Sequence, residues 1–149
     1  MQKTFIKKAS FRDIPEIVCL IEELFAIEKD FVFDKQKQTN ALKILLDEPT
    51  AVVLTAMYDN SLVGFASMQR VVSTSVGGYC GLIEDVIIKD GYRHQGIGHL
   101  LLEKLICESK KLSYKRLQLL CDITNSQAQD FYTKLGFTKS QMMGWYKEH

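Results

Sequence analysis

A glycine-rich turn, Arg93-His94-Gln95-Gly96-Ile97-Gly98, lies between the apolar run Leu82–Ile88 and a segment with an apolar helical stripe. Glycines at the start of a helix let the backbone approach a ligand, and the free amides at the positive end of the helix dipole attract an anion. Two nucleotide fingerprints do not fit: Ile97-Gly98 replaces the Lys-Ser/Thr pair of Walker A, and Leu101 replaces the third Rossmann glycine. The turn therefore predicts an anion site of another kind. The alternative is a tight strand-to-helix connection that binds nothing.

Two adjacent carboxylates, Glu84 and Asp85, interrupt the apolar run that precedes this turn. Strand alternation predicts that their side chains point to opposite faces of a sheet, so we do not expect a close carboxylate pair. A carboxylate inside an apolar strand costs free energy unless it is solvated or paired. At least one of the two is therefore a candidate for proton transfer. The alternative is an edge carboxylate bonded to a neighbouring turn.

Strands and helices must position these residues. Apolar residues spaced at i, i+3, i+4 and i+7 from Ile14 to Phe25 predict a helix capped by Ser10 or Asp13. Asn125 predicts the cap of a later helix, and Gly136 predicts its left-handed end. The remaining patterns predict six strands and two more helices. The predicted strands are 4–8, 51–58, 62–72, 82–88, 116–121 and 137–149, with helices between 8 and 51, from Gly96 to Leu112, and after Asn125.

The order of these elements predicts a single α/β (α+β mixed) domain over residues 1–149. The hairpin at Asp59–Ser61 requires antiparallel neighbours, whereas the strand-helix-strand unit around Gly96 requires a parallel pair with a right-handed crossover. A chain of 149 residues is long enough for one ordinary core. The predicted sheet is therefore mixed.

Composition and charge argue against some classes of partner but do not indicate which reaction the protein catalyses. Nineteen Lys and Arg against eighteen Asp and Glu give a net charge of +1, which argues against nucleic acid as the main partner. No apolar stretch is long enough for a membrane span, and the N-terminal residues lack the apolar core of a signal peptide. We therefore expect a soluble, cytoplasmic protein with no nucleic-acid or membrane partner.

The four cysteines have spacings that favour reduced, buried thiols over disulfides: Cys19, Cys80, Cys107 and Cys121. No histidine lies at ligand spacing from any of them, so no metal site is expected. The same lack of a histidine partner argues against a covalent acyl-cysteine mechanism.

Two motifs resemble those of the GNAT superfamily of N-acetyltransferases. The order of strand, Arg-x-x-Gly-x-Gly and helix resembles the family's acyl-CoA-binding signature. Asn125-Ser126-Gln127-Ala128-Gln129-Asp130-Phe131-Tyr132, followed by Leu135-Gly136-Phe137, resembles the family's Asn-x-x-Ala-x-x-Phe-Tyr…Gly-Phe segment. The resemblance covers the whole chain in length and element order. It implies a mostly antiparallel sheet with helices on both faces and a parallel pair at the cofactor cleft.

The resemblance also implies that acetyl-CoA is the co-substrate. It implies that the turn's backbone amides bind the pyrophosphate of coenzyme A and that the preceding strand presents backbone groups to the pantetheine arm. His94 stands where a glycine is frequent in the family. The implied cofactor-binding residues are Val86, Ile87, Ile88, Arg93, His94, Gln95, Gly96, Ile97, Gly98, Asn125, Phe131 and Tyr132.

The resemblance assigns catalytic roles as well. Tyr132 matches the family's general acid, and a phenol of pKa about 10 can protonate a thiolate whose parent thiol has a pKa of about 8.5. Helical spacing alone favours a core aromatic side chain at this position. Similarity to small-amine branches, including diamine acetyltransferases, implies that Glu84 is the base that deprotonates the amine through water. Asp85 is the alternative base or an amine-binding charge, and no metal is needed.

The acceptor site is predicted from aromatic and acidic side chains. Glu28 and Phe31 lie in a segment that often covers the acceptor in this superfamily, and Trp145 near the C-terminus resembles the ending of diamine acetyltransferases. An aromatic face with carboxylates suits a cationic amine. A solvated charged loop and a core tryptophan are the alternative. The serines of Ser73-Thr74-Ser75 offer a different acceptor, an anionic aminophosphonate, or simply form a loop.

Together these observations predict an acetyl-CoA-dependent N-acetyltransferase that acts on a small primary amine by direct transfer in a ternary complex. Three alternatives stay open: a protein lysine or N-terminal acetyltransferase, a non-catalytic acyl-CoA sensor, and a binding module for another phosphate ligand. Similar proteins are frequently homodimers, and the predicted C-terminal strand could supply such an interface.

Overall fold

The computed structural model describes residues 4–149, and the chain divides into two compact units. The first unit ends at Gln118 and contains the sheet and three α-helices; the second is Leu119–His149. In order, the elements up to the boundary are β1 (Thr4–Lys8), a 3-10 turn (Phe11–Asp13), α1 (Ile14–Ile27), α2 (Lys35–Asp47), β2 (Val52–Tyr58), β3 (Ser61–Ser73), β4 (Gly78–Ile88), α3 (Ile97–Lys111) and β5 (Arg116–Leu119).

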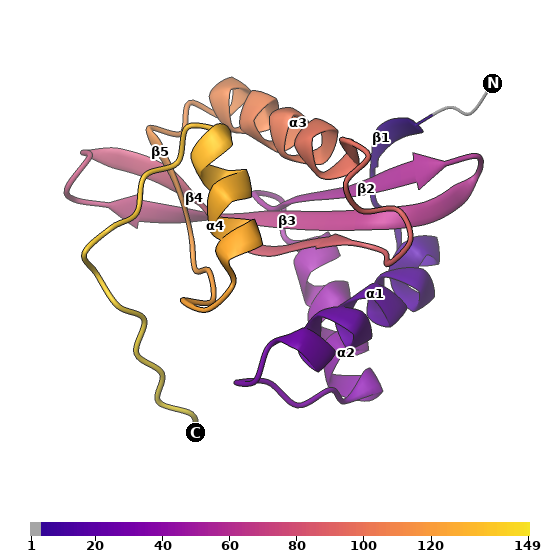
Figure 1. The fold of residues 1–149 in the computed structure, drawn as a ribbon. Helices are drawn as coiled ribbons and strands as arrows, with labels where there is room; N and C mark the ends of the chain where they lie inside the picture. Colours follow the sequence, from indigo (N-terminus) through magenta and orange to yellow (C-terminus); the bar gives the residue numbers. More distant parts are fainter. Residues whose placement is uncertain (1–3) are drawn as a thin grey trace. The chain divides into compact units, whose positions relative to one another are not determined.

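The sheet has the strand order β1-β2-β3-β4-β5. The first four strands pair antiparallel, and β5 runs parallel to β4, so the predicted mixed and mostly antiparallel sheet is confirmed. Figure 1 shows α1 and α2 on one face of the sheet and α3 on the other, which confirms the predicted helices on both faces. The β4–α3–β5 unit is the predicted parallel crossover around Gly96.

The core between α1, α2 and the sheet follows from the predicted apolar stripe. Ile17, Val18 and Ile21 of α1 pack in one buried cluster with Phe65 of β3 and Ile87 of β4. On the other face, α3 contributes buried side chains from one side of its helix: Ile97, Leu101, Leu102 and Leu105. Burial on both sides explains why the central strands read as nearly continuous apolar runs.

The first helix begins where the sequence predicts. The Asp13 carboxylate accepts a hydrogen bond from Ser10 N at 2.8 Å, which completes a capping box with Ser10. Lys7 on β1 forms an ion pair of 2.9 Å with the same carboxylate. This bonding lowers the pKa of Asp13, in opposition to its burial, which is the largest influence and raises it. The network fixes the entry of α1 against the edge strand.

The second unit contains α4 (Ser126–Lys134). Asn125 Oδ1 accepts a hydrogen bond from Ala128 N at 3.1 Å, and Gly136 has a φ of 91°, so both predicted caps are confirmed. The predicted strand from Phe137 onward is wrong, because residues 137–149 contain no strand. A strand forms only against the backbone of a neighbour, and alternation within one segment does not supply that neighbour.

The prediction of buried thiols holds for one cysteine. All four cysteines are free thiols; Cys80 is buried, Cys121 is half-buried, and Cys19 and Cys107 are exposed. Cys19 lies between the buried residues Val18 and Leu20, but the helix turns its side chain outward, because successive residues point about 100° apart. Among residues 4–149, no helix is long and apolar enough to cross a membrane.

Candidate active site

The glycine-rich turn leads into α3 as predicted. Gly91 and Gly96 have φ values of 86° and 81°, a left-handed region that suits glycine. The first hydrogen bond at the head of the helix runs from Leu100 N to Gly96 O at 3.1 Å, so the amides of Ile97, Gly98 and His99 precede it. No described side chain caps this end of α3. The helix therefore presents unbonded amides where an anion would bind.

His94 also adopts a left-handed backbone, with a φ of 62°. A side chain with a Cβ is strained in this region, and glycine is not. The turn keeps a histidine at a local cost in free energy.

Arg93 holds the turn together from within. Its Nε donates to Ile88 O at 2.9 Å, and its guanidinium lies 3.9 Å from Glu23 Oε2 and 4.0 Å from Asp90 Oδ1. Glu23 Oε2 also accepts a hydrogen bond from Asp90 N at 3.1 Å. The positive charge of Arg93 is thus matched by two carboxylates, so anion binding by this turn depends on its backbone amides.

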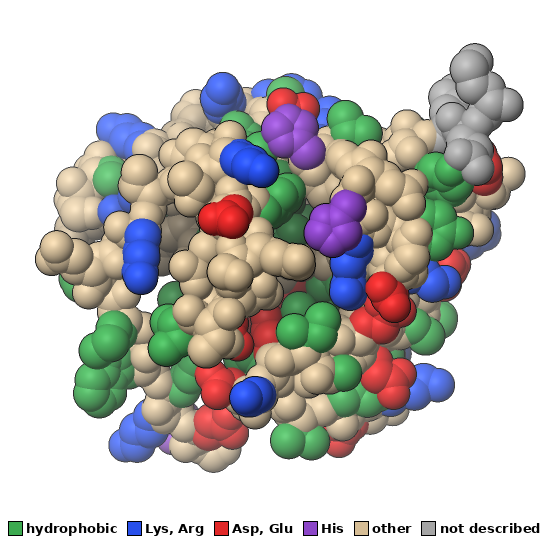
Figure 2. Space-filling view, viewed as in Figure 1, with side chains coloured by type: hydrophobic (Ala, Val, Ile, Leu, Met, Phe, Trp, Pro, Cys, Tyr) green, Lys and Arg blue, Asp and Glu red, His purple; other side chains and the backbone are tan. Residues whose placement is uncertain are grey.

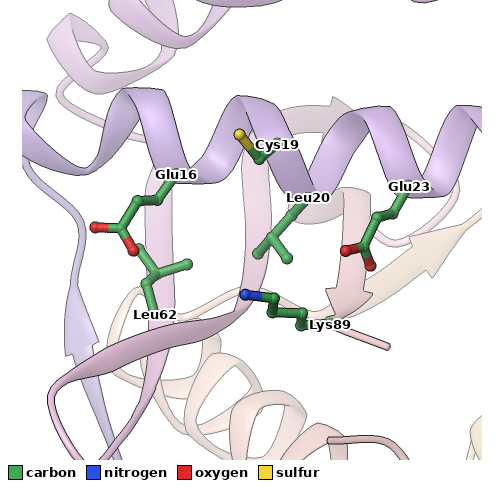
Figure 3. Close-up of a pocket in the computed structure, with 6 residues that line it drawn as sticks. All are labelled: Glu16, Cys19, Leu20, Glu23, Leu62 and Lys89. Atoms are coloured by element: carbon green, nitrogen blue, oxygen red, sulfur yellow. The ribbon is translucent and has the colours of Figure 1, made fainter. Parts of the chain in front are cut away.

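A pocket lies beside this link (Figure 3). Glu16, Leu20 and Glu23 project from α1 toward Leu62 of β3 and Lys89, which follows β4, and the exposed Cys19 also belongs to the lining. The lining includes neither the carboxylate pair of β4 nor the head of α3. The pocket therefore adjoins the turn without containing the predicted catalytic groups.

A β-bulge in β4 changes the expected orientation of Glu84 and Asp85. Ala66 of β3 pairs with Val86, whereas Met68, two residues further along β3, pairs with Ile83. Glu84 and Asp85 therefore occupy the space opposite a single residue of β3, as in a bulge. Ala66 and Met68 are two residues apart, so they point to the same face of the sheet, and so do Val86 and Ile83, which pair with them. The side chains of Glu84 and Asp85, between these pairs, therefore both lie on the opposite face. The prediction that they point to opposite faces is wrong.

Asp85 is half-buried on the face covered by α1, and Glu84 is exposed. Burial raises the pKa of Asp85 to about 7, and the neighbouring charges of Glu84 and Glu28 raise it in the same direction. Glu28 is the C-terminal cap residue of α1, so the end of this helix brings a third carboxylate toward the pair. A carboxyl group with this pKa can exchange a proton near neutral pH.

The segment after α1 supplies an aromatic group and a cap. The Phe31 ring lies 5.3 Å from that of Phe25, and the side chain is 40% exposed. Asp34 caps α2, because its Oδ1 accepts hydrogen bonds from Gln36 N and Lys37 N at 3.0 and 3.1 Å. Of the predicted acceptor residues in the first unit, Glu28 thus acts on Asp85 electrostatically, and Phe31 packs with Phe25 at the surface.

The serines after β3 are engaged with a neighbouring strand. Ser73 Oγ and Ser75 Oγ lie 2.9 Å apart, and Arg116 donates to them at 3.3 and 2.9 Å. This arrangement closes the end of the β3–β4 hairpin onto β5. Figure 2 shows lysine and arginine side chains scattered over the visible face of the described chain, without one merged basic patch.

In the second unit, Tyr132 belongs to an aromatic cluster. Its ring lies 5.2 Å from that of Phe131 and 5.8 Å from that of Phe137, both in edge-on geometry. Phe137 N also donates to Tyr132 O at 3.0 Å, which closes the end of α4. Trp145 is 86% exposed, so it is not the core tryptophan of the alternative interpretation.

The outer edge of β4 has more backbone than β5 can pair. β4 has 11 residues and β5 has four. The two strands meet near the start of β4, where Lys115 N donates to Tyr79 O at 2.9 Å and a Cβ on Gly81 would lie 2.7 Å from Leu117 Cδ2. The stretch from Glu84 to Ile88 therefore has no β5 partner. It offers the backbone groups that an extended ligand needs.

Comparisons with known proteins identify the family of this chain. The model of the Acetyltransferase (GNAT) family matches residues 18–137. Histone acetyltransferase TAP1 of Glycine max is 35% identical over 81 residues, which are 52% of this chain and 34% of that protein. An uncharacterized N-acetyltransferase of Mycobacterium tuberculosis is 27% identical over 108 residues, 70% of this chain and 66% of that protein. The chain thus spans about a third of the plant relative.

A solved structure shows the same fold. The aminoglycoside N-acetyltransferase AAC(6')-Iy, in complex with CoA, superimposes with a TM-score of 0.86 over 99% of this chain and 96% of that one. Its sequence identity is 14%, so the likeness is one of fold.

Proposed function

The chain belongs to the acetyltransferase (GNAT) family, and on that premise we propose that it transfers the acetyl group of acetyl-CoA to a primary amine of a small cationic molecule. Transfer is direct, within a ternary complex of both substrates. The observation that carries this proposal is the gathering of Glu84 and Asp85 in the β4 bulge with Glu28 at the end of α1. Burial raises the pKa of Asp85, and the charges of Glu84 and Glu28 raise it further. Such a cluster favours a positively charged acceptor over an anionic one.

The residues present fit coenzyme A. The amides from Arg93 to Gly98, ahead of the uncapped α3, would bind its pyrophosphate, and the unpaired edge from Val86 to Ile88 would bind its extended arm. Asn125, Phe131 and Tyr132 would contribute from the second motif. When bound, acetyl-CoA supplies the activated acyl carbon as a thioester.

The chain's own groups would move the protons. Asp85, ionised above its pKa, accepts the proton of the substrate ammonium group, so that the neutral amine can form the new C–N bond. A backbone amide on the open edge of β4 stabilises the charge that develops on the carbonyl oxygen. Tyr132 gives its proton to the departing sulfur as the C–S bond breaks. Glu84, which the family resemblance implies as the base, is exposed and would help bind the cation.

A second candidate function is acetylation of a protein amine. It is favoured by one observation, the 35% identity with a protein named histone acetyltransferase. A lysine side chain carries the same cationic amine, so the carboxylate cluster suits it too. The two functions differ in whether residues flanking the amine are needed for turnover.

The test is a thiol-release assay with acetyl-CoA and a panel of acceptors: aminoglycosides, diamines, amino acids, aminophosphonates and lysine peptides. We expect the multiply charged small amines to give the highest kcat/KM. Preference for a lysine peptide over the free amine would support the second function. Preference for an aminophosphonate would contradict the role given to the carboxylates. Calorimetry with coenzyme A, performed in parallel, shows whether a lack of turnover comes from failure to bind the cofactor or from failure to accept the amines tested.

A further inference from the structure

Ser67 carries a hydroxyl group that the packing of the described residues leaves unsatisfied. The residue is 0% exposed, and its Oγ is the one buried side-chain nitrogen or oxygen in residues 4–149 without a hydrogen-bond partner. Buried polar groups in native proteins are nearly always hydrogen-bonded, because an unmade bond costs free energy. A group of this kind calls for a specific explanation.

The strand register places Ser67 beside the bulged carboxylates. It lies between Ala66, which pairs with Val86, and Met68, which pairs with Ile83, so it is the single residue opposite Glu84 and Asp85. On the other side it pairs with Val53 of β2. Ser67 is therefore at the centre of the sheet, directly across from the two groups that could accept a proton.

The hydroxyl and the Asp85 carboxylate also share a face of the sheet. Phe65 and Ile87 pair with each other and both belong to the core cluster under α1. Ser67 is two residues beyond Phe65, and Asp85 is two residues before Ile87, so strand alternation turns both toward α1. Burial raises the pKa of Asp85, and the charges of Glu84 on its own strand and Glu28 at the end of α1 raise it further, with no hydrogen bond from a described residue among the causes.

We propose that Ser67 is a positioning residue for proton transfer: its hydroxyl and the Asp85 carboxylate hold one water molecule through which the substrate ammonium group gives up its proton. The water accepts the ammonium proton and passes one of its own to Asp85, so no net charge is created. A water with two such partners satisfies the buried hydroxyl and spans a gap too long for a direct bond. This inference rests on the proposed acetyl transfer and adds a residue that neither motif contains.

Loss of the Ser67 hydroxyl would affect the stability of the fold and the rate of turnover differently. If the hydroxyl were only a packing feature, Ser67→Ala would remove an unsatisfied polar atom and leave turnover unchanged. If it helps hold the water, the same change leaves the fold intact but weakens proton transfer. It also removes a hydrogen-bond donor that favours ionised Asp85, so the acid limb of the kcat/KM profile moves to higher pH.

The experiment compares Ser67→Ala with the wild-type protein and with Ser109→Ala. Ser109 is a matched control, because it too is buried, but its Oγ donates to Ile106 O at 2.7 Å within α3. We expect Ser67→Ala to lower kcat about tenfold at pH 7, as loss of part of a proton-transfer device does, with an unchanged or higher Tm and unchanged affinity for coenzyme A. Ser109→Ala should lower the Tm and leave the pH profile unchanged.

A second measurement keeps the inference independent of turnover. The 13C carboxyl resonance of Asp85 is followed through a pH titration of both proteins without substrate. We expect a higher titration midpoint in Ser67→Ala. An unchanged midpoint together with an unchanged kcat overturns the role of Ser67. A shifted midpoint in a protein that acetylates no amine overturns the proposed function and leaves the coupling of Ser67 to Asp85 standing.

Discussion

The backbone N–H of Asp90 donates a hydrogen bond of 3.1 Å to Oε2 of Glu23, which joins the turn ahead of α3 to helix α1. The same carboxylate lies 3.9 Å from Arg93, whose Nε holds the end of β4. One side chain of α1 thus restrains the segment whose amides would bind the pyrophosphate. Because Glu23 and Asp90 are far apart in the sequence, this hydrogen bond fixes the first residues of the turn against α1.

Replacing Glu23 with alanine should therefore weaken binding of coenzyme A. We expect the dissociation constant, measured by calorimetry, to rise about threefold to tenfold, since a lost hydrogen bond to a charged group is worth roughly 1 kcal/mol or more. Glu16→Ala is the control, because Glu16 is exposed on the same side of α1 and makes no bond to the turn. Equal affinities in the two variants would show that the link does not order the turn.

Asp85→Asn should abolish most of the activity without affecting the cofactor. Loss of a general base commonly costs about 100-fold or more in rate, so kcat should fall by at least that factor at pH 8. In the wild-type protein the acid limb of kcat/KM should have its midpoint near the Asp85 pKa of about 7. Glu84→Gln should retain the acid limb. If Glu84→Gln removes it and Asp85→Asn does not, the base is Glu84.

The same substitution has a predicted effect on stability with a definite sign. The pKa of Asp85 is raised in the folded protein, from 3.8 to about 7, so the folded state holds its proton more tightly than the unfolded state. Stability therefore falls as the pH rises through this interval. Asp85→Asn should have a higher Tm than the wild type at pH 8, and the difference should disappear near pH 4. A difference that is the same at both pH values would contradict the raised pKa.

Tyr132→Phe should separate catalysis from binding. The ring would keep its contacts with Phe131 and Phe137, so α4 should remain folded. Without the phenol, no proton reaches the departing sulfur from this residue, and kcat should fall about 100-fold. The dissociation constant of coenzyme A should change less than twofold, which is less than about 0.4 kcal/mol in binding free energy. Full turnover in this variant would assign the acid to another group.

His94→Gly should stabilise the protein. The φ of 62° at this residue is unfavourable for a side chain with a Cβ by about 1 kcal/mol, and glycine removes that cost. Gln95→Gly is the comparison, because Gln95 lies next to it without a positive φ. Glycine there adds flexibility and removes the hydrogen bond from Gln95 Nε2 to Gly91 O at 3.1 Å. Urea unfolding should give a higher midpoint for the first variant and a lower one for the second. The reverse order would mean that the histidine ring makes up for the backbone strain.

Local patterns were sufficient for the elements whose causes are local. The bonds at the starts of the first and last helical segments are made by Asp13 and Asn125, whose side chains accept from amides three residues away, Ser10 N and Ala128 N. The apolar stripe of α1 and the turn at Gly96 are equally visible in one short stretch of sequence. These features depend on no other part of the chain, so they are predictable from the residues that form them.

The arrangement of the carboxylates was not predictable in this way. The orientation of Glu84 and Asp85 depends on a bulge, and a bulge is a property of the register between β3 and β4. The involvement of Ser67 and Glu23 has the same origin, because each meets its neighbours through tertiary pairing. A serine in a buried strand between Ala66 and Met68 was the one available signal, and alone it is consistent with a small core residue.

The stretch of β4 from Glu84 to Ile88, which β5 does not pair, affects how readily copies of the protein associate. Unpaired strand edges are templates for association with other chains, and many proteins protect them with charges or irregular backbone. Here Glu84 and Asp85 put two carboxylates and a bulge at that edge. The groups proposed to receive the substrate proton are thus also placed to keep one copy from adding its strand to another. Replacing both carboxylates with neutral side chains should therefore lower the solubility of the protein as well as its activity.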